Sequence, residues 1–128
     1  MPACVYCDRR SNRISMVKIE ATIQPFRLDD VKTALDGIGI ESITTSEAQE
    51  HGARAVHKGT YRGAEYRIDS PRLRIEIITS SDRADEVIEA LARAARTRSS
   101  ADDGVILVYE VSDAIRIATG ARLEFARV

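Results

Sequence analysis

The sequence predicts an α+β fold in which a strand–helix–strand unit occurs twice. In residues 17–23 apolar and polar side chains alternate, as they do in a strand with one buried face. In residues 28–38 apolar side chains recur every three or four positions, which is the spacing of a helix with one buried face. The same two patterns return in residues 73–77 and 87–95. Residues 40–48 and 105–111 are the strands expected to close the two units.

The residues at the segment ends support the first unit. Pro25 follows the first alternating segment and cannot donate to a strand ladder. Asp29 and Asp30 fall in the first turn of the expected helix, where the helix dipole favours negative charge. Gly37 and Gly39 end the helical pattern. Each signal places the helix between the same two strands.

The second unit carries matching signals. Residues 80–82 offer serine and aspartate side chains as helix N-caps. Arg93, Arg96 and Arg98 lie toward the other end of the expected helix, where cations suit the dipole. Two such units form the split βαβ, or ferredoxin-like, arrangement (βαββαβ). Its helices cover one face of the sheet, so we expect self-association to cover the other.

Composition excludes several classes of protein. The chain has 128 residues, enough for one domain, and its formal net charge is −1. This charge does not favour binding to nucleic acid or to an anionic membrane surface. No apolar run reaches the roughly 20 residues that cross a bilayer, so membrane insertion is not expected. The first residues lack the apolar segment of a secretory signal, and a cytoplasmic location is expected.

Residues 1–15 are interpreted as a polar N-terminal leader, expected to be disordered, and residues 16–128 as the folded domain. Cys4 and Cys7 have the spacing of a redox pair or of half a zinc site. Two further zinc ligands and the strand that normally precedes a redox pair are missing from the pattern, which favours an inert leader. We therefore expect that deleting the residues before Met16 leaves the fold, assembly and ligand binding unchanged.

A long polar segment, residues 49–70, separates the two units. Connections of this length inside a compact domain are uncommon and are usually functional or mobile. The segment contains both histidines, His51 and His57, which we expect to be solvated. A disordered insertion is the alternative interpretation.

Four short motifs, in this order, resemble the PII family of signal-transduction proteins. They are residues 16–32, which begin Met-Val-Lys-Ile-Glu, then Tyr61-Arg-Gly-Ala-Glu-Tyr66, residues 73–78, and Ile115-Arg-Ile-Ala-Thr-Gly120. The resemblance implies a homotrimer that binds ATP or ADP in the clefts between subunits. It implies a regulator that is not an enzyme, and it identifies residues 49–70 as the family's T-loop, which docks on a transporter or a metabolic enzyme.

The resemblance also implies the residues of the nucleotide site. The expected set is Thr44, Gly52, Arg54, Arg72, Glu76, Ile78, Asp102, Asp103, Gly104 and Arg116. Tyr66 aligns with a tyrosine that some relatives carry in a uridylylated or adenylylated form. A loop tyrosine that packs on a partner or on the trimer is the alternative for Tyr66.

Departures from the family pattern remove positive charge from the expected phosphate site. Val105 stands where the family has a lysine, and Ala118 stands where it has a second arginine. Asp102 replaces a glycine and adds a carboxylate. Each change weakens charge-assisted hydrogen bonding to phosphate. The expected ligand is therefore an adenine nucleotide, ADP, AMP or ATP, with ADP or AMP preferred over ATP.

Magnesium and 2-oxoglutarate are doubtful ligands. Arg54 aligns with the glutamine that would ligate magnesium, and a guanidinium has no lone pair to offer a metal. Gln24 replaces a further lysine, whereas Arg72 retains some capacity for a carboxylate. We therefore expect that 2-oxoglutarate does not tighten ATP binding and that magnesium has little effect.

Three hypotheses about function remain open at this point. The first is a regulator that senses an adenine nucleotide, and retained Gly104, Arg116 and Gly120 favour it. The second is a sensor of another small anion, such as bicarbonate in the control of inorganic carbon. The third is a trimeric interaction subunit that needs no ligand. The losses at Val105 and Ala118 favour the second and third.

Overall fold

The computed structural model describes residues 13–40, 42–51, 56–61, 64–98, 103–123 and 125–126. The strands are β1 (Arg13–Ile14), β2 (Met16–Ile23), β3 (Thr44–Glu50), β4 (Val56–Tyr61), β5 (Ala64–Ser80), β6 (Ile106–Val111) and β7 (Phe125–Ala126). The helices are α1 (Leu28–Gly37) and α2 (Ala84–Ala95). Short 3-10 turns, η1 (Pro25–Arg27) and η2 (Ser81–Arg83), lead into them.

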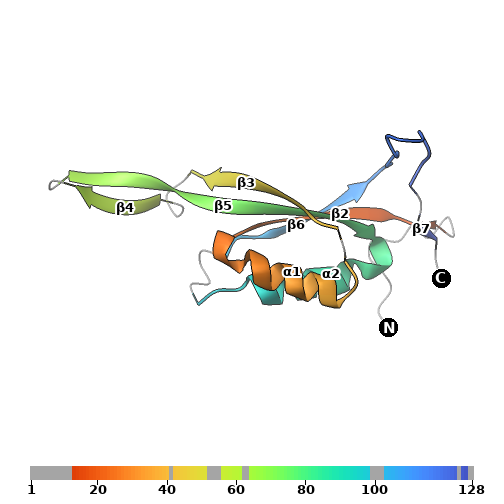
Figure 1. Ribbon diagram of the computed structural model, residues 1–128, viewed down its shortest axis with the longest axis horizontal. Helices are drawn as coiled ribbons and strands as arrows, with labels where there is room; N and C mark the ends of the chain where they lie inside the picture. Colours follow the sequence, from red (N-terminus) through yellow and green to blue (C-terminus); the bar gives the residue numbers. More distant parts are fainter. Residues whose placement is uncertain are drawn as a thin grey trace.

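The main sheet is antiparallel and has the strand order β3-β5-β2-β6. Both helices lie on the same face of this sheet (Figure 1). The two central strands belong to different units, because β2 opens the first unit and β5 opens the second. This arrangement confirms the predicted ferredoxin-like fold.

The core forms where alternate residues of the central strands meet the two helices. Ile19 of β2 lies opposite Ile77 of β5, and both are buried. Aliphatic side chains from both helices complete the cluster. Its buried members are Val17, Ile19, Ala21, Ile23, Val31, Leu35, Ile75, Ile77, Ala84, Val87, Leu91 and Ala95. The fold is therefore held by packing of aliphatic side chains, as the low aromatic content suggests.

Two arginines connect the helices in the same way at opposite ends. Arg27, just before α1, donates from Nε and Nη2 to the Ala94 carbonyl at 2.9 and 2.7 Å, near the end of α2. Arg83, just before α2, donates from Nη2 to the Ile38 carbonyl, just beyond the end of α1. Carbonyls at a helix C-terminus lack partners within the helix and attract cations. The two strand–helix–strand units therefore repeat these side-chain contacts as well as the backbone pattern.

The segment expected to be a long loop contains a hairpin. β4 pairs antiparallel with residues 64–69 of β5, and β5 continues without interruption into the main sheet. Tyr61 lies opposite Ala64, so the two strands are joined through two residues, a common length for a hairpin connection. Figure 1 shows this hairpin projecting beyond the helices at one end of the molecule.

The first and last described strands pair at the other end of the sheet. β1 pairs antiparallel with β7, with Arg13 opposite Ala126 and Ile14 opposite Phe125. The Ser15 carbonyl accepts a hydrogen bond of 2.7 Å from the Ser81 amide. Residues 13–15, which the sequence assigns to a disordered leader, therefore take part in the fold. Cys4 and Cys7 lie outside the described residues. In the described part of the chain, neither helix has the length and apolar character needed to cross a bilayer.

Candidate functional site

A tight turn before β6 carries the best-defined part of the expected nucleotide site. Gly104 has a φ of +82°, a conformation that L side chains rarely adopt. A Cβ atom at this position would lie 2.6 Å from the Thr22 carbonyl oxygen of β2. Backbone cannot yield as a flexible side chain can. The turn therefore requires glycine, because it lies close against the end of β2.

Asp103 is held by Thr97, in the segment that follows α2. Its carboxylate accepts hydrogen bonds from the Thr97 amide at 3.0 and 3.1 Å and from the Thr97 hydroxyl. The side-chain bond first, then the backbone bond and the nearby charges of Arg27 and Arg96, lower the pKa of Asp103. The charge of Asp103 is thus used to close the loop between α2 and β6.

A cavity of about 320 Å³ opens beside this turn. It lies between the end of α2, the end of β2 and the start of β6. Its lining residues are Ala21, Thr22, Ile23, Ala92, Ala95, Arg96, Thr97, Asp103, Gly104, Val105 and Ile106. Val105, where the family resemblance leads one to expect a lysine, is 68% exposed. Its aliphatic side chain therefore replaces a cation at an accessible position.

Strand pairing brings three further candidates to the sheet face that the helices leave bare. Thr44 of β3 lies opposite Glu76 of β5, and Ile78 follows two residues along the same strand. Residues two apart on a strand share a face. Glu76 also lies 4.0 Å from Lys18 Nζ, and Ile78 is 45% exposed. These residues therefore offer an accessible surface that is partly polar and partly apolar.

Arg72 is engaged within the chain. It is only 5% exposed, and its Nε lies 3.4 Å from Oε2 of Glu50, at the end of β3. Glu50 is the last residue of β3, and Arg72 lies in β5 where the hairpin leaves the main sheet. The pair therefore fixes the root of the hairpin. A ligand carboxylate at Arg72 would have to compete with Glu50.

Arg116 lies in a small hairpin near the C-terminus. The Leu123 amide donates to the Ala114 carbonyl at 2.8 Å, and the Arg116 amide donates to the Ala121 carbonyl at 2.9 Å. Gly120, with a φ of +71°, donates from its amide to the Arg116 carbonyl at 2.8 Å. We call residues 113–123 the C-terminal hairpin. Its closed backbone leaves Arg116 exposed near the tip.

The structure does not bring Arg116 to the turn at Gly104. Gly104 precedes β6 and Arg116 follows it, and six strand residues span about 20 Å at about 3.3 Å per residue. Figure 1 shows the chain leaving β6 at the end of the sheet opposite the turn. One chain therefore presents the two expected halves of the phosphate site at separate places.

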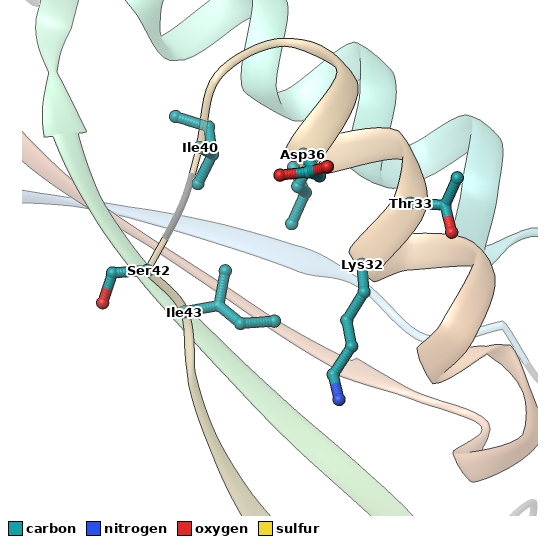
Figure 2. Close-up of a pocket in the computed structure, with 7 residues that line it drawn as sticks. Lys32, Thr33, Asp36, Ile40, Ser42 and Ile43 are labelled. Atoms are coloured by element: carbon teal, nitrogen blue, oxygen red, sulfur yellow. The ribbon is translucent and has the colours of Figure 1, made fainter.

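A second cavity, of about 470 Å³, lies between α1 and the segment that leads into β3. Figure 2 shows Ile43 pointing toward α1, from which Lys32 and Asp36 project, and Ser42 pointing away. None of the expected nucleotide-binding residues lines this cavity. It is therefore separate from the cavity beside Gly104.

Three of the expected residues, Gly52, Arg54 and Asp102, lie outside the described residues. Tyr66 lies in β5 opposite Gly59 of β4, so its backbone belongs to the projecting hairpin. Within the described ranges, no three His, Cys, Asp or Glu side chains are grouped as metal ligands.

Sequence reasoning did not identify the roles of Thr97 and Glu50. Thr97 holds the carboxylate of Asp103, and Glu50 holds the guanidinium of Arg72. Neither residue belongs to a motif, and their partners are set by the tertiary fold. Glu50 is brought near Arg72 only by the pairing of β3 with β5.

Comparison with known proteins gives consistent matches. Residues 16–121 match the family model described as nitrogen regulatory protein P-II. The chain is 46% identical over 108 residues to the nitrogen regulatory protein P-II of Rhodospirillum rubrum, which covers 84% of this chain and 96% of the relative. It is 46% identical over 106 residues to that of Bradyrhizobium diazoefficiens, covering 82% and 94%. A crystal structure of Arabidopsis thaliana PII bound to citrate is similar, with a TM-score of 0.70, 31% identity, and coverage of 88% and 90%.

Replacement of Gly104 by alanine should destabilise the protein. The new Cβ would collide with the Thr22 carbonyl in a backbone conformation that alanine disfavours, so we expect a loss of at least about 2 kcal/mol in the free energy of unfolding. Gly37→Ala is the matched control, since that glycine ends α1 with no atom within 4 Å of the added Cβ. It should change stability by less than about 1 kcal/mol. Urea denaturation measures both, and equal effects would contradict the role of the turn.

Acid should release the loop held by Asp103. The pKa of Asp103 is lowered in the folded protein, so the unfolded chain binds this proton more readily and stability rises with pH through this range. The contribution is fully present above the ordinary value of 3.8 and is lost as pH falls through the lowered value. The difference in unfolding free energy between wild type and Asp103→Asn should therefore be constant at neutral pH and shrink below that value. A difference that grows on acidification would contradict this assignment.

Proposed function

The chain belongs to the nitrogen regulatory protein P-II family, and on this premise we propose that it is a signal-transduction regulator that binds an adenine nucleotide between the subunits of a homotrimer. We propose further that it acts in the cytoplasm by docking its projecting hairpin on a transporter or a metabolic enzyme. A regulator of this kind works by differential binding, because each ligand favours one conformation and the partner recognises it. No catalytic turnover is part of the proposal.

The separation of Gly104 from Arg116 is the observation that carries the inter-subunit site. Both residues match family motifs associated with the nucleotide, yet they lie at opposite ends of β6. One nucleotide can contact both only if they come from different chains. A closed ring of identical subunits provides such a meeting at every interface.

The bare sheet face supports self-association. Three large apolar or aromatic side chains are exposed on it, Ile78 by 45%, Leu107 by 44% and Tyr109 by 42%. Lys18 Nζ lies 4.8 Å from the centre of the Tyr109 ring, and Tyr109 donates to Glu20 at 3.5 Å. Such a surface combines exposed apolar side chains with the neighbouring charges of Lys18, Glu20 and Glu76, and it is suited to burial against another subunit.

The hairpin of β4 and β5 supports the docking role. It projects away from both helices, and β5 runs from the hairpin into the central part of the sheet (Figure 1). The pair of Arg72 and Glu50 fixes its root. A partner that binds the hairpin would therefore contact β5, the same strand that carries Glu76 and Ile78.

The ligand proposed is an adenine nucleotide bound with fewer cations than the family pattern supplies. Val105 and Ala118 bring no charge to the phosphates, which favours ADP or AMP over ATP. Arg54 has no lone pair for magnesium, so the proposal includes neither that ion nor a 2-oxoglutarate bound through it.

Mixing two defective chains tests the inter-subunit site. Arg116→Ala should weaken ATP binding about ten- to a hundredfold by removing a charge-assisted contact. Val105→Glu should weaken it by placing a carboxylate beside the phosphates. Co-expression of the two variants should restore about one wild-type site in four by random assortment in trimers. Calorimetry of the mixed species measures this fraction.

Each variant alone is the control for that mixture, and light scattering should give the mass of a trimer for all three samples. No restored binding in confirmed mixed trimers would contradict a site shared between chains. A stable monomer at micromolar concentration would contradict the assembly itself.

Restoring a cation tests the ligand. Val105→Lys should tighten ATP binding about tenfold, because Val105 is exposed beside the cavity and a lysine there can reach a phosphate. Val105→Gln, similar in length but neutral, is the matched control and should change the affinity little. Calorimetric titration with ATP, ADP, AMP and bicarbonate gives the affinities. Binding of bicarbonate alone by the wild type, or equal effects of lysine and glutamine, would contradict the nucleotide proposal.

A further inference from the structure

A two-stranded ribbon joins parts of the chain that the family match does not include. The match spans residues 16–121, whereas β1 precedes Met16 and β7 begins at Phe125. β1 and β7 nevertheless pair with each other. The shared family pattern therefore does not account for this ribbon, and its effect must be sought in this chain.

The C-terminal hairpin has little of its own to hold it in place. Ile115 is 58% exposed and Ile117 is fully exposed, so neither packs into the core. The ion pair of Arg122 with Asp113, at 3.1 Å, joins two exposed side chains of the hairpin itself. Exposed pairs contribute little, and an isolated two-stranded hairpin is marginal in water. Its position must therefore depend on how its two ends are attached.

One end is attached through β6, which pairs with β2. The other end leads to β7, which pairs with β1. A single residue, Ser15, separates β1 from β2, and its carbonyl is bound by the Ser81 amide at 2.7 Å. β1 is thus fixed both to the central strand of the sheet and to the start of η2. Figure 1 shows β7 beside the beginning of β2.

We infer that residues 13–15 form an N-terminal anchor that holds the C-terminal hairpin through the pairing of β1 with β7, and thereby positions Arg116 for the nucleotide of a neighbouring subunit. The part that concerns the nucleotide rests on the proposed function. Arg116 lies between two attachment points, one at each end of its hairpin. If the pairing of β1 with β7 is removed, the hairpin is attached through β6 alone. Arg116 is then less well positioned before the nucleotide binds, which lowers the affinity. The sequence pattern alone predicts that all residues before Met16 are dispensable, whereas the anchor requires residues 13–15 and leaves residues 2–12 dispensable.

Four chains test the anchor. They are the full chain, a chain that lacks residues 2–12 and keeps β1, a chain that begins at Met16, and a chain that ends at Leu123. The last removes β7 but keeps Ser15, so it separates strand pairing from the hydrogen bond to Ser81. The readouts are hydrogen exchange of the amides in the C-terminal hairpin without nucleotide, and ATP affinity.

Amide exchange in the hairpin should be at least about tenfold faster in the chain that begins at Met16 and in the chain that ends at Leu123. The chain that lacks residues 2–12 should match the full chain. Amides of β2 and β5 should stay protected in all four, which shows that the fold is intact. ATP affinity should fall roughly three- to tenfold in the two chains without the ribbon.

Unchanged exchange in both chains without the ribbon would overturn the anchor. Faster exchange with unchanged ATP affinity would overturn the positioning of Arg116. Loss of protection when residues 2–12 are removed would place the anchor before Arg13 and overturn its assignment to residues 13–15. If the full chain binds no ATP, the proposed function fails, and the exchange measurements still decide whether the anchor exists.

Discussion

The antiparallel pairing of β2 with β5 is the interaction on which the rest of the structure depends. Every residue of β2 lies opposite a residue of β5. The aliphatic side chains on one face of these two strands form the surface on which both helices pack. The same ladder fixes the other face, where alternate residues must point away from the helices. A shift by one residue would bury Lys18 and Glu20 and expose Ile19. The pairing that buries one face of the sheet therefore also determines which side chains are exposed on the other face.

Local patterns in the sequence predict the fold well where the pattern arises from burial of side chains in the core. The alternation around Ile19 and the helical spacing around Leu91 arise from the core itself, so both units can be read directly. The hairpin was not predicted, although part of it carries a strand signal. Residues 56–61 of β4 show no apolar alternation. In β5, Ala64, Tyr66 and Ile68 alternate with charged residues, but the interpretation of this segment as a loop did not use that pattern. The pairing of β1 with β7 left even less signal, because it joins residues more than a hundred positions apart.

Prediction of the candidate site was limited for a different reason. The sequence motif identifies Gly104 as a turn residue. The structure explains why glycine is required there, because a Cβ atom would collide with the Thr22 carbonyl. The state of the charged residues cannot be read from a motif, because it depends on what the fold places beside them. The carboxylate of Asp103 accepts hydrogen bonds from Thr97, which stabilise its charged form, and Arg72 faces Glu50. A motif thus indicates which residues are near a ligand, whereas only the tertiary contacts show which of them are available to it.

Arg72 illustrates how such contacts limit which side chains are available to a ligand. Its guanidinium is almost fully buried, and a buried cation is costly unless an anion accompanies it. Glu50 supplies that anion from within the chain, at the root of the hairpin. A ligand carboxylate that reached Arg72 would displace Glu50 and exchange one ion pair for another, so little free energy would remain to move the hairpin. Val105 is different, because it is exposed and the fold does not need it. Substitution of Val105 can therefore change the charge beside the cavity without loss of the fold, whereas the root of the hairpin is fixed by the cost of leaving Arg72 unpaired.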